Sequence, residues 1–240
     1  MLRRFLCILA ILTVCRAALA APGELVMIAP TDLTMPLVQF HDGQLSAGIL
    51  KDLGDALAQR LGRRASYLNV DVDGVTPTLT EGRADGICYV LPHWIDGDYQ
   101  WSRPLIPDAE LVVARDGAPP IRSLADLRDR PIGTVTGYRY PRVEQVLGSR
   151  FFRTESPTMD KNLRRLMAGD VQYTILVQSS MAYLTRNDKT LRLRPDLVFS
   201  TYKAQCAFSR RSRIPFQDIS RAIDALVDDG SVERILARYR

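Results

Sequence analysis

Histidine and long apolar runs are scarce in this chain of 240 residues, and each shortage excludes a class of protein. The histidines are His41 and His93 alone, so a metal site built from several histidines is not available. A catalytic triad would have to use one of these two. Only residues 5–21 form a strongly apolar stretch, and Arg16 interrupts it. A bundle of membrane-spanning helices, which needs several runs of about 20 apolar residues, is therefore excluded.

The overall composition is that of a folded protein. Hydrophobic residues make up 46% of the chain and charged residues 25%, whereas a disordered chain carries far fewer apolar residues. The length fits one large domain or two small ones, and it is enough to bury a sizeable core. No residue pattern indicates a cofactor or a resident metal ion, so we expect neither.

The N-terminal segment is typical of a cleavable export signal. Residues 3–4 are basic, residues 5–14 are apolar, and residues 18–20 form an A-x-A cleavage site. The apolar run is too short to cross a membrane. A lipoprotein acylated at Cys15 fits poorly, because Val14 precedes the cysteine where a small residue belongs. We therefore expect cleavage after residue 20 and a location in the periplasm.

Cleavage changes the charge argument. The full chain has a formal net charge of +5, but residues 1–20 carry three arginines and no acidic residue. The mature chain is therefore almost neutral, and its charge gives no reason to expect a nucleic-acid partner.

Cleavage also leaves Cys88 and Cys206 as the mature cysteines. In an oxidising compartment these two form a candidate disulfide, and two buried free thiols are an equal alternative.

Apolar periodicity predicts alternating strands and helices. The expected strands are 24–29, 65–70, 85–90, 111–114, 132–136 and 171–177. The expected helices are 48–61, 73–81, 123–127, one that begins at Pro141, 156–168 and 179–186. Two more helices are expected at the C-terminus, around 219–226 and 232–239. Strand–helix–strand order indicates parallel α/β sheets. The pattern starts again after residue 110, so we expect two α/β units of similar size.

Short motifs then follow one another in a characteristic order. They are Gly48–Leu53, Leu79–Asp85, Trp101–Pro104, Ser123–Leu127 with Gly133 and Gly137 after it, Leu166–Val171 and Asp229–Ser231. In this order and spacing the chain resembles the family 3 extracellular solute-binding proteins, the periplasmic amino-acid-binding components of ABC transporters. Each motif alone is unspecific, but together they cover nearly all of the mature chain.

This resemblance implies a two-lobed periplasmic-binding-protein fold of type II, in which each lobe is a central sheet flanked by helices. Lobe 1 would comprise residues 21–106 and 204–240, and lobe 2 residues 107–203. A small ligand would bind in the cleft between them, and the lobes would close on it by a hinge. The implied partner of this monomer is an inner-membrane ABC permease, with no catalytic residues and no nucleic acid involved.

The resemblance leaves two alternative functions open. One is a ligand-sensing module for a membrane signalling receptor, which the sequence does not separate from transport. The other, less favoured, is a cleft enzyme of the cyclohexadienyl dehydratase type. Its catalytic acid would be Asp32, Asp96 or Asp98, but none of these has a partner carboxylate or base at an informative spacing.

The chain departs from the family at the positions that hold an amino acid. The arginine that pairs with the ligand carboxylate aligns with Ile95, and the aspartate that takes the ligand ammonium aligns with Val177. A buried ligand charge without a partner costs several kcal/mol. We therefore expect ordinary α-amino acids to bind weakly.

Other residues offer a substitute site. Arg139, next to Tyr138 at an expected helix start, would recapture an anionic group, although it would equally serve as a solvated partner of Glu144. The expected ligand-binding residues are Tyr89, Trp94, Tyr138, Arg139 and Gln178, with Tyr140 as a further aromatic candidate. The expected ligand is a small polar or anionic solute, amino-acid-like or carrying a carboxylate on an apolar body.

The implied fold also bears on the cysteines. Cys88 would lie in the strand that leaves lobe 1 and Cys206 in the strand that returns to it. Since these two strands are neighbours in the implied fold, we expect the cysteines to be close enough to form a disulfide at the base of lobe 1.

Overall fold

The computed structural model describes residues 23–240. The expected export signal therefore lies outside the described residues. Within residues 23–240, none of the helices is both long and apolar enough to span a bilayer.

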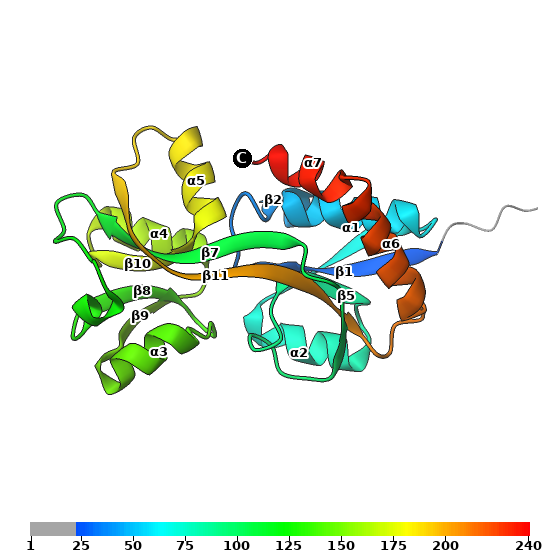
Figure 1. The fold of residues 1–240 in the computed structure, drawn as a ribbon, viewed down its shortest axis with the longest axis horizontal. Helices are drawn as coiled ribbons and strands as arrows, with labels where there is room; N and C mark the ends of the chain where they lie inside the picture. Colours follow the sequence, from blue (N-terminus) through cyan, green and yellow to red (C-terminus); the bar gives the residue numbers. More distant parts are fainter. Residues whose placement is uncertain (1–22) are drawn as a thin grey trace, which may run out of the picture.

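The first half of the chain forms a parallel sheet with helices against it (Figure 1). Its elements are β1 (Glu24–Pro30), β2 (Gln39–His41), β3 (Gln44–Ala47), α1 (Ile49–Arg60), β4 (Arg64–Val70), α2 (Val72–Glu81), β5 (Gly86–Val90) and β6 (Tyr99–Trp101). Strand β1 lies between β4 and β5 and runs parallel to both. Helix α1 buries Leu50, Leu53 and Leu57, the spacing that predicted it.

The second half repeats this plan. Its elements are β7 (Ile106–Arg115), η1 (Leu124–Leu127), β8 (Pro131–Val135), α3 (Pro141–Leu147), η2 (Gly148–Arg150), β9 (Phe152–Ser156), α4 (Met159–Ala168), β10 (Tyr173–Val177) and α5 (Gln178–Asn187). Strand β8 runs parallel to β9 and β10, and β10 pairs antiparallel with β7. Short helix η1 begins with a capping box between Ser123 and Asp126.

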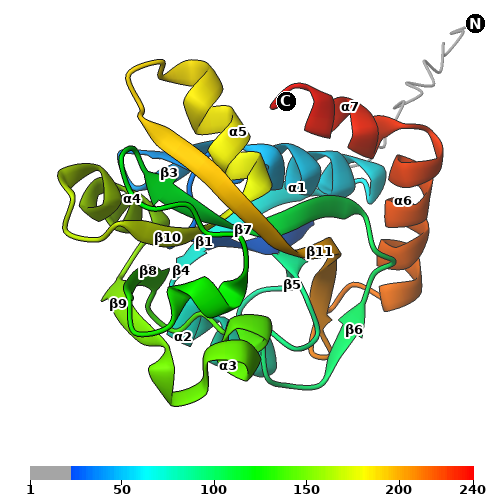
Figure 2. The same cartoon turned by 60° about the vertical axis from the view of Figure 1, so that its left-hand side comes forward.

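Strand β11 (Leu193–Ser209) joins the two halves. It pairs antiparallel with β7 along the second half and then with β5 and β6 in the first half. Figure 2 shows it running from the end of α5 to the region of β5 and β6. Strands β7 and β11 are therefore the two connections that cross between the halves. The predicted lobe boundaries, near residues 106 and 204, fall within these two strands.

The last two helices return to the first half. Helix α6 (Phe216–Asp228) buries Ile219, Ile223 and Leu226, and α7 (Ser231–Ala237) follows it. Both helices lie next to α1 (Figures 1 and 2). They share one apolar cluster with α1, β1 and β5, and separate clusters fill the second half. Each half therefore has its own core, as expected for two lobes.

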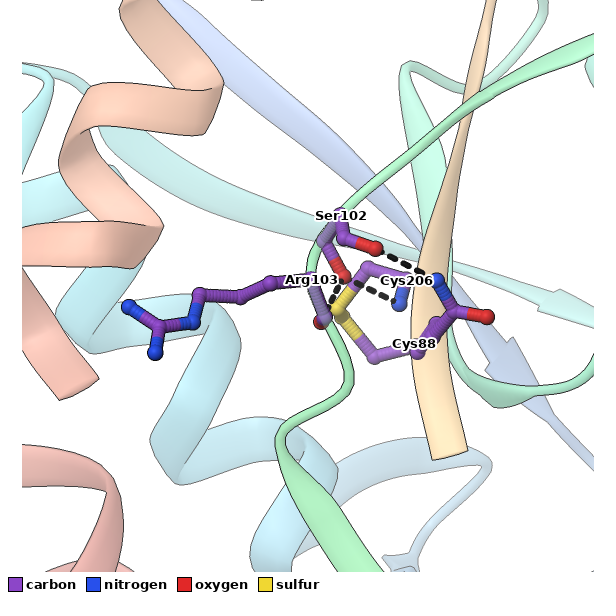
Figure 3. Close-up of a disulfide and its surroundings, with 5 residues drawn as sticks. Cys88, Ser102, Arg103 and Cys206 are labelled. Carbon is purple, nitrogen blue, oxygen red and sulfur yellow. Dashed lines mark hydrogen bonds between the residues drawn. A yellow bond between two sulfur atoms is a disulfide. The ribbon is translucent and has the colours of Figure 1, made fainter. Parts of the chain in front are cut away.

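The structure joins Cys88 and Cys206 in a disulfide (Figure 3). The two residues face each other in the antiparallel register of β5 and β11, with Cα atoms 3.9 Å apart. Both are buried, and the N–H of Cys206 donates to Oγ of Ser102 at 2.9 Å. The disulfide therefore lies inside the first half, at the point where β11 returns.

Candidate functional site

A cavity of about 270 Å³ opens between the two halves. The first half contributes the loop after β1, the start of α2 and the turn after β5. The second half contributes Glu110 of β7, the turn after β8, the start of α4, the end of β10 and Ser180 of α5. Because both halves line this cavity, a molecule bound in it would contact both at once.

Four aromatic side chains line the cavity, and all four are candidates that the sequence offered as ligand-binding residues: Tyr89, Trp94, Tyr138 and Tyr140. The Tyr89 hydroxyl donates to Asp108 at 2.6 Å, and Asp108 also accepts from the hydroxyl of Ser179 at 2.6 Å. This link ties the end of β5 to the start of α5. The cavity wall is thus largely apolar, and its tyrosine hydroxyls are fixed by hydrogen bonds.

Two carboxyl groups are buried in the same cavity. Asp32 is 4% exposed and Glu110 is 9% exposed. Oδ2 of Asp32 accepts a hydrogen bond from the hydroxyl of Tyr138, while its buried Oδ1 has no partner within the described residues. Burial raises the pKa of Asp32 despite that hydrogen bond, and burial raises the pKa of Glu110 to about 7. Both groups therefore lack a counter-charge.

Arg139 lies at the cavity, but its guanidinium is already occupied. It pairs with both carboxylate oxygens of Asp96, one of them at 3.0 Å, and also donates to the carbonyl of His93. This hydrogen-bonded pair holds the pKa of Asp96 below its usual range. The suggested alternative, a pair with Glu144, is not the one formed, because Asp96 from the other half of the molecule is closer.

The two positions that the motif resemblance aligns with charged anchors are apolar and line the cavity. Ile95 and Val177 both contribute to its wall, so neither supplies a charge to a ligand. Gln178 is the first residue of α5, is exposed and does not line the cavity. A ligand contact by Gln178 therefore stays a prediction, and this cavity gives it no support. Ser180 lines the cavity instead, and its buried hydroxyl has no partner within the described residues.

The two halves also touch each other beside the cavity. The N–H of Met159 donates to the carbonyl of Asp32 at 2.8 Å, and the hydroxyl of Thr34 donates to Asp160 at 2.6 Å. At Gly137, φ is +78°, and an added Cβ would lie 2.8 Å from Cγ1 of Val72 in the other half. The absence of a side chain at residue 137 therefore permits this close approach.

Solved structures match this arrangement over most of the chain. An ancestral arginine-binding protein bound to arginine is 20% identical, with 92% of this chain and 99% of that chain covered and a TM-score of 0.78. The chain has the two-lobed periplasmic-binding-protein fold. The arginine-, lysine-, histidine-binding protein ArtJ of Geobacillus stearothermophilus is 17% identical over 90% of this chain and 95% of its own, with a TM-score of 0.77.

A third structure with the two-lobed periplasmic-binding-protein fold is the ancestral amino-acid-binding protein AncCDT-1, described as a precursor of cyclohexadienyl dehydratase. It is 16% identical over 90% of this chain and 95% of its own, with a TM-score of 0.75. No family model and no curated protein matches the sequence. The structural matches confirm the fold that the motifs predicted.

Sequence reasoning missed part of the polar lining. Glu110 is the single charged residue within the apolar run 109–114, a visible sign of a buried acid. Asp32 was considered only as a catalytic acid, and Ser180 was not considered. Whether these three residues line the cavity depends on how β7, α5 and the loop after β1 meet in space. Local sequence patterns do not show this.

Proposed function

We propose that this protein is a periplasmic solute-binding protein that captures a small organic molecule in the cavity between its halves and presents it to an ABC-type permease. The observation that carries the proposal is the cavity itself, which both halves line and to which the crossing strand β7 contributes Glu110. Solved structures with this fold include two that are named as substrate-binding proteins of amino-acid ABC transporters.

The geometry supports capture by closure. The halves are connected through β7 and β11, so bending of these strands would separate the walls of the cavity. The contacts of Asp32 with Tyr138 and of Asp96 with Arg139 join one half to the other and would break on opening. A ligand that touches both walls would favour the closed arrangement by its additional contacts.

Binding fits the cavity better than catalysis does. Of the acids considered for an enzyme, Asp96 and Asp98 are exposed and paired with Arg139 and Arg210. Asp32 is buried and hydrogen-bonded to a tyrosine whose own pKa is raised by burial. None of these pairs supplies a base poised to take a proton from a substrate.

A thermal-shift screen of the purified protein tests the proposal. The panel contains amino acids, organic acids, amines and neutral sugars, and a ligand at about 100 times its Kd should stabilise the protein by about 2.7 kcal/mol. The variant Ile95→Trp places a large side chain in the cavity wall and should lose this shift. Val198→Trp, at an exposed position of β11 outside the cavity, is the control and should keep it. If no class of solute shifts the wild type, the proposal fails.

A further inference from the structure

The charges that line the cavity are strongly unbalanced. Among the described residues that line it, the acids are Asp32, Asp73, Asp96 and Glu110, and the one base is Arg139. Asp96 and Arg139 neutralise each other at the exposed rim. The buried part of the cavity therefore carries two acids, Asp32 and Glu110, and no cation.

Asp32 lines the cavity and has one buried carboxylate oxygen without a hydrogen-bond partner among the described residues. Its main-chain carbonyl is held by the N–H of Met159, and Oδ2 is held by the hydroxyl of Tyr138. Oδ1 is buried and accepts no hydrogen bond from any described residue. A buried carboxylate oxygen without a donor is unfavourable, and a ligand N–H is the donor that would satisfy it.

Glu110 stands on the opposite half with no basic neighbour. It lies on β7, whose strand neighbours at this position are Val177 of β10 and Ser200 of β11. Neither residue supplies a positive charge. The nearby titratable groups are Tyr140 and Tyr202, both neutral because burial raises their pKa. Glu110 is thus a second acceptor that faces the cavity without a counter-ion.

A ligand carboxylate would be unfavourable in this setting. It would place another carboxylate in a part of the cavity where burial already raises the pKa of both Asp32 and Glu110, so negative charge is disfavoured there. Arg139 would have to leave Asp96 to compensate, and it lies at the exposed rim rather than beside Asp32. The family's arginine position, Ile95, offers only an apolar side chain.

We propose that the cavity binds an organic cation, namely an amine or guanidine on an apolar body without a carboxylate, whose N–H groups donate to Asp32 and Glu110. This inference rests on the proposed solute-binding function and reverses the ligand charge expected from the sequence. The aromatic side chains of Tyr89, Trp94 and Tyr138 suit it further, because aromatic rings attract cations through their faces.

Matched pairs of compounds test the inference by calorimetric titration. Phenethylamine, agmatine and cadaverine are compared with phenylalanine, arginine and lysine, which differ from them only by a carboxylate. We expect at least one amine to bind about 10- to 100-fold more tightly than its amino acid. Asp32→Asn and Glu110→Gln, which remove charge at nearly constant shape, should each weaken that amine about tenfold or more. Asp98→Asn, an exposed acid outside the cavity, should leave it unchanged.

The outcomes separate this inference from the proposed function. If an amino acid or organic acid binds more tightly than every amine, the cavity binds solutes but the inference is wrong. The same holds if Asp32→Asn and Glu110→Gln both leave the affinity of the bound amine unchanged. If none of the amines binds while a neutral solute shifts the melting temperature, the inference again fails and the proposed function stands.

Discussion

Glu110 should make the stability of the protein depend on pH in a defined window. Burial raises its pKa to about 7, from 4.5 for an unperturbed glutamate, and Ser200 offsets this only in part. Because the folded state holds the proton to a higher pH than the unfolded state, stability is fully present below pH 4.5 and is lost as pH rises toward 7. A shift of this size corresponds to a loss of about 3 kcal/mol.

The variant Glu110→Gln isolates this effect. Urea unfolding of the wild type and the variant at about pH 5 and about pH 8 gives the free energy of unfolding of each. The wild type should lose about 2.5 kcal/mol more than the variant between these two values. Asp98→Asn removes an exposed, paired carboxylate and should follow the wild type. Parallel profiles for the wild type and Glu110→Gln would refute the reasoning, because they would mean that Glu110 is ionised and solvated in the folded protein.

Two further substitutions test the fold around the cavity. The disulfide between Cys88 and Cys206 spans 118 residues, so replacing both by alanine should lower the free energy of unfolding by about 2–5 kcal/mol in urea, and a loss below about 1 kcal/mol would contradict this. Gly137→Ala should weaken ligand binding about tenfold or more, because the new methyl group meets Val72 across the cavity. Gly117→Ala has the same backbone conformation in open space and is the control; equal affinities in the two variants would exclude a steric block to closure.

The helices and the central strands could be predicted from the sequence, because the periodic spacing of apolar residues that marks each element lies within that element. Helix α1 shows this in the burial of Leu50, Leu53 and Leu57. Strand β9 (Phe152–Ser156) was missed because most of its residues are polar or half-exposed. The full length of β11 was also missed, since Pro195 and register shifts interrupt its alternation and its pairing partners lie far away in the chain.

The candidate site was only partly predictable for a related reason. Aromatic residues at or after the ends of strands, such as Tyr89 within β5 and Tyr138 after β8, lie where the motifs implied the cleft. The partner of Arg139 was not predictable, because Asp96 is 43 residues away and belongs to the other half. A sequence shows which residues carry charge, but the pairing of charges across a cavity depends on how the halves meet.

The two buried acids give the cavity a way to couple closure to the charge of the ligand. Opening of the halves would let water reach Asp32 and Glu110 and would reduce the cost of their burial. In the closed arrangement both carboxyl groups are buried, Oδ1 of Asp32 has no donor among the described residues, and Ser200 offsets the burial of Glu110 only in part, so a desolvation cost opposes closing. A cationic ligand supplies the missing donors and charge, so it offsets this cost only in the closed arrangement. An anion adds to the cost, and a neutral apolar molecule leaves it in place. A ligand shifts the equilibrium between the open and closed arrangements only by the difference in its affinity for the two. Asp32 and Glu110 would therefore make closure selective for cations, even though most of the cavity wall is apolar.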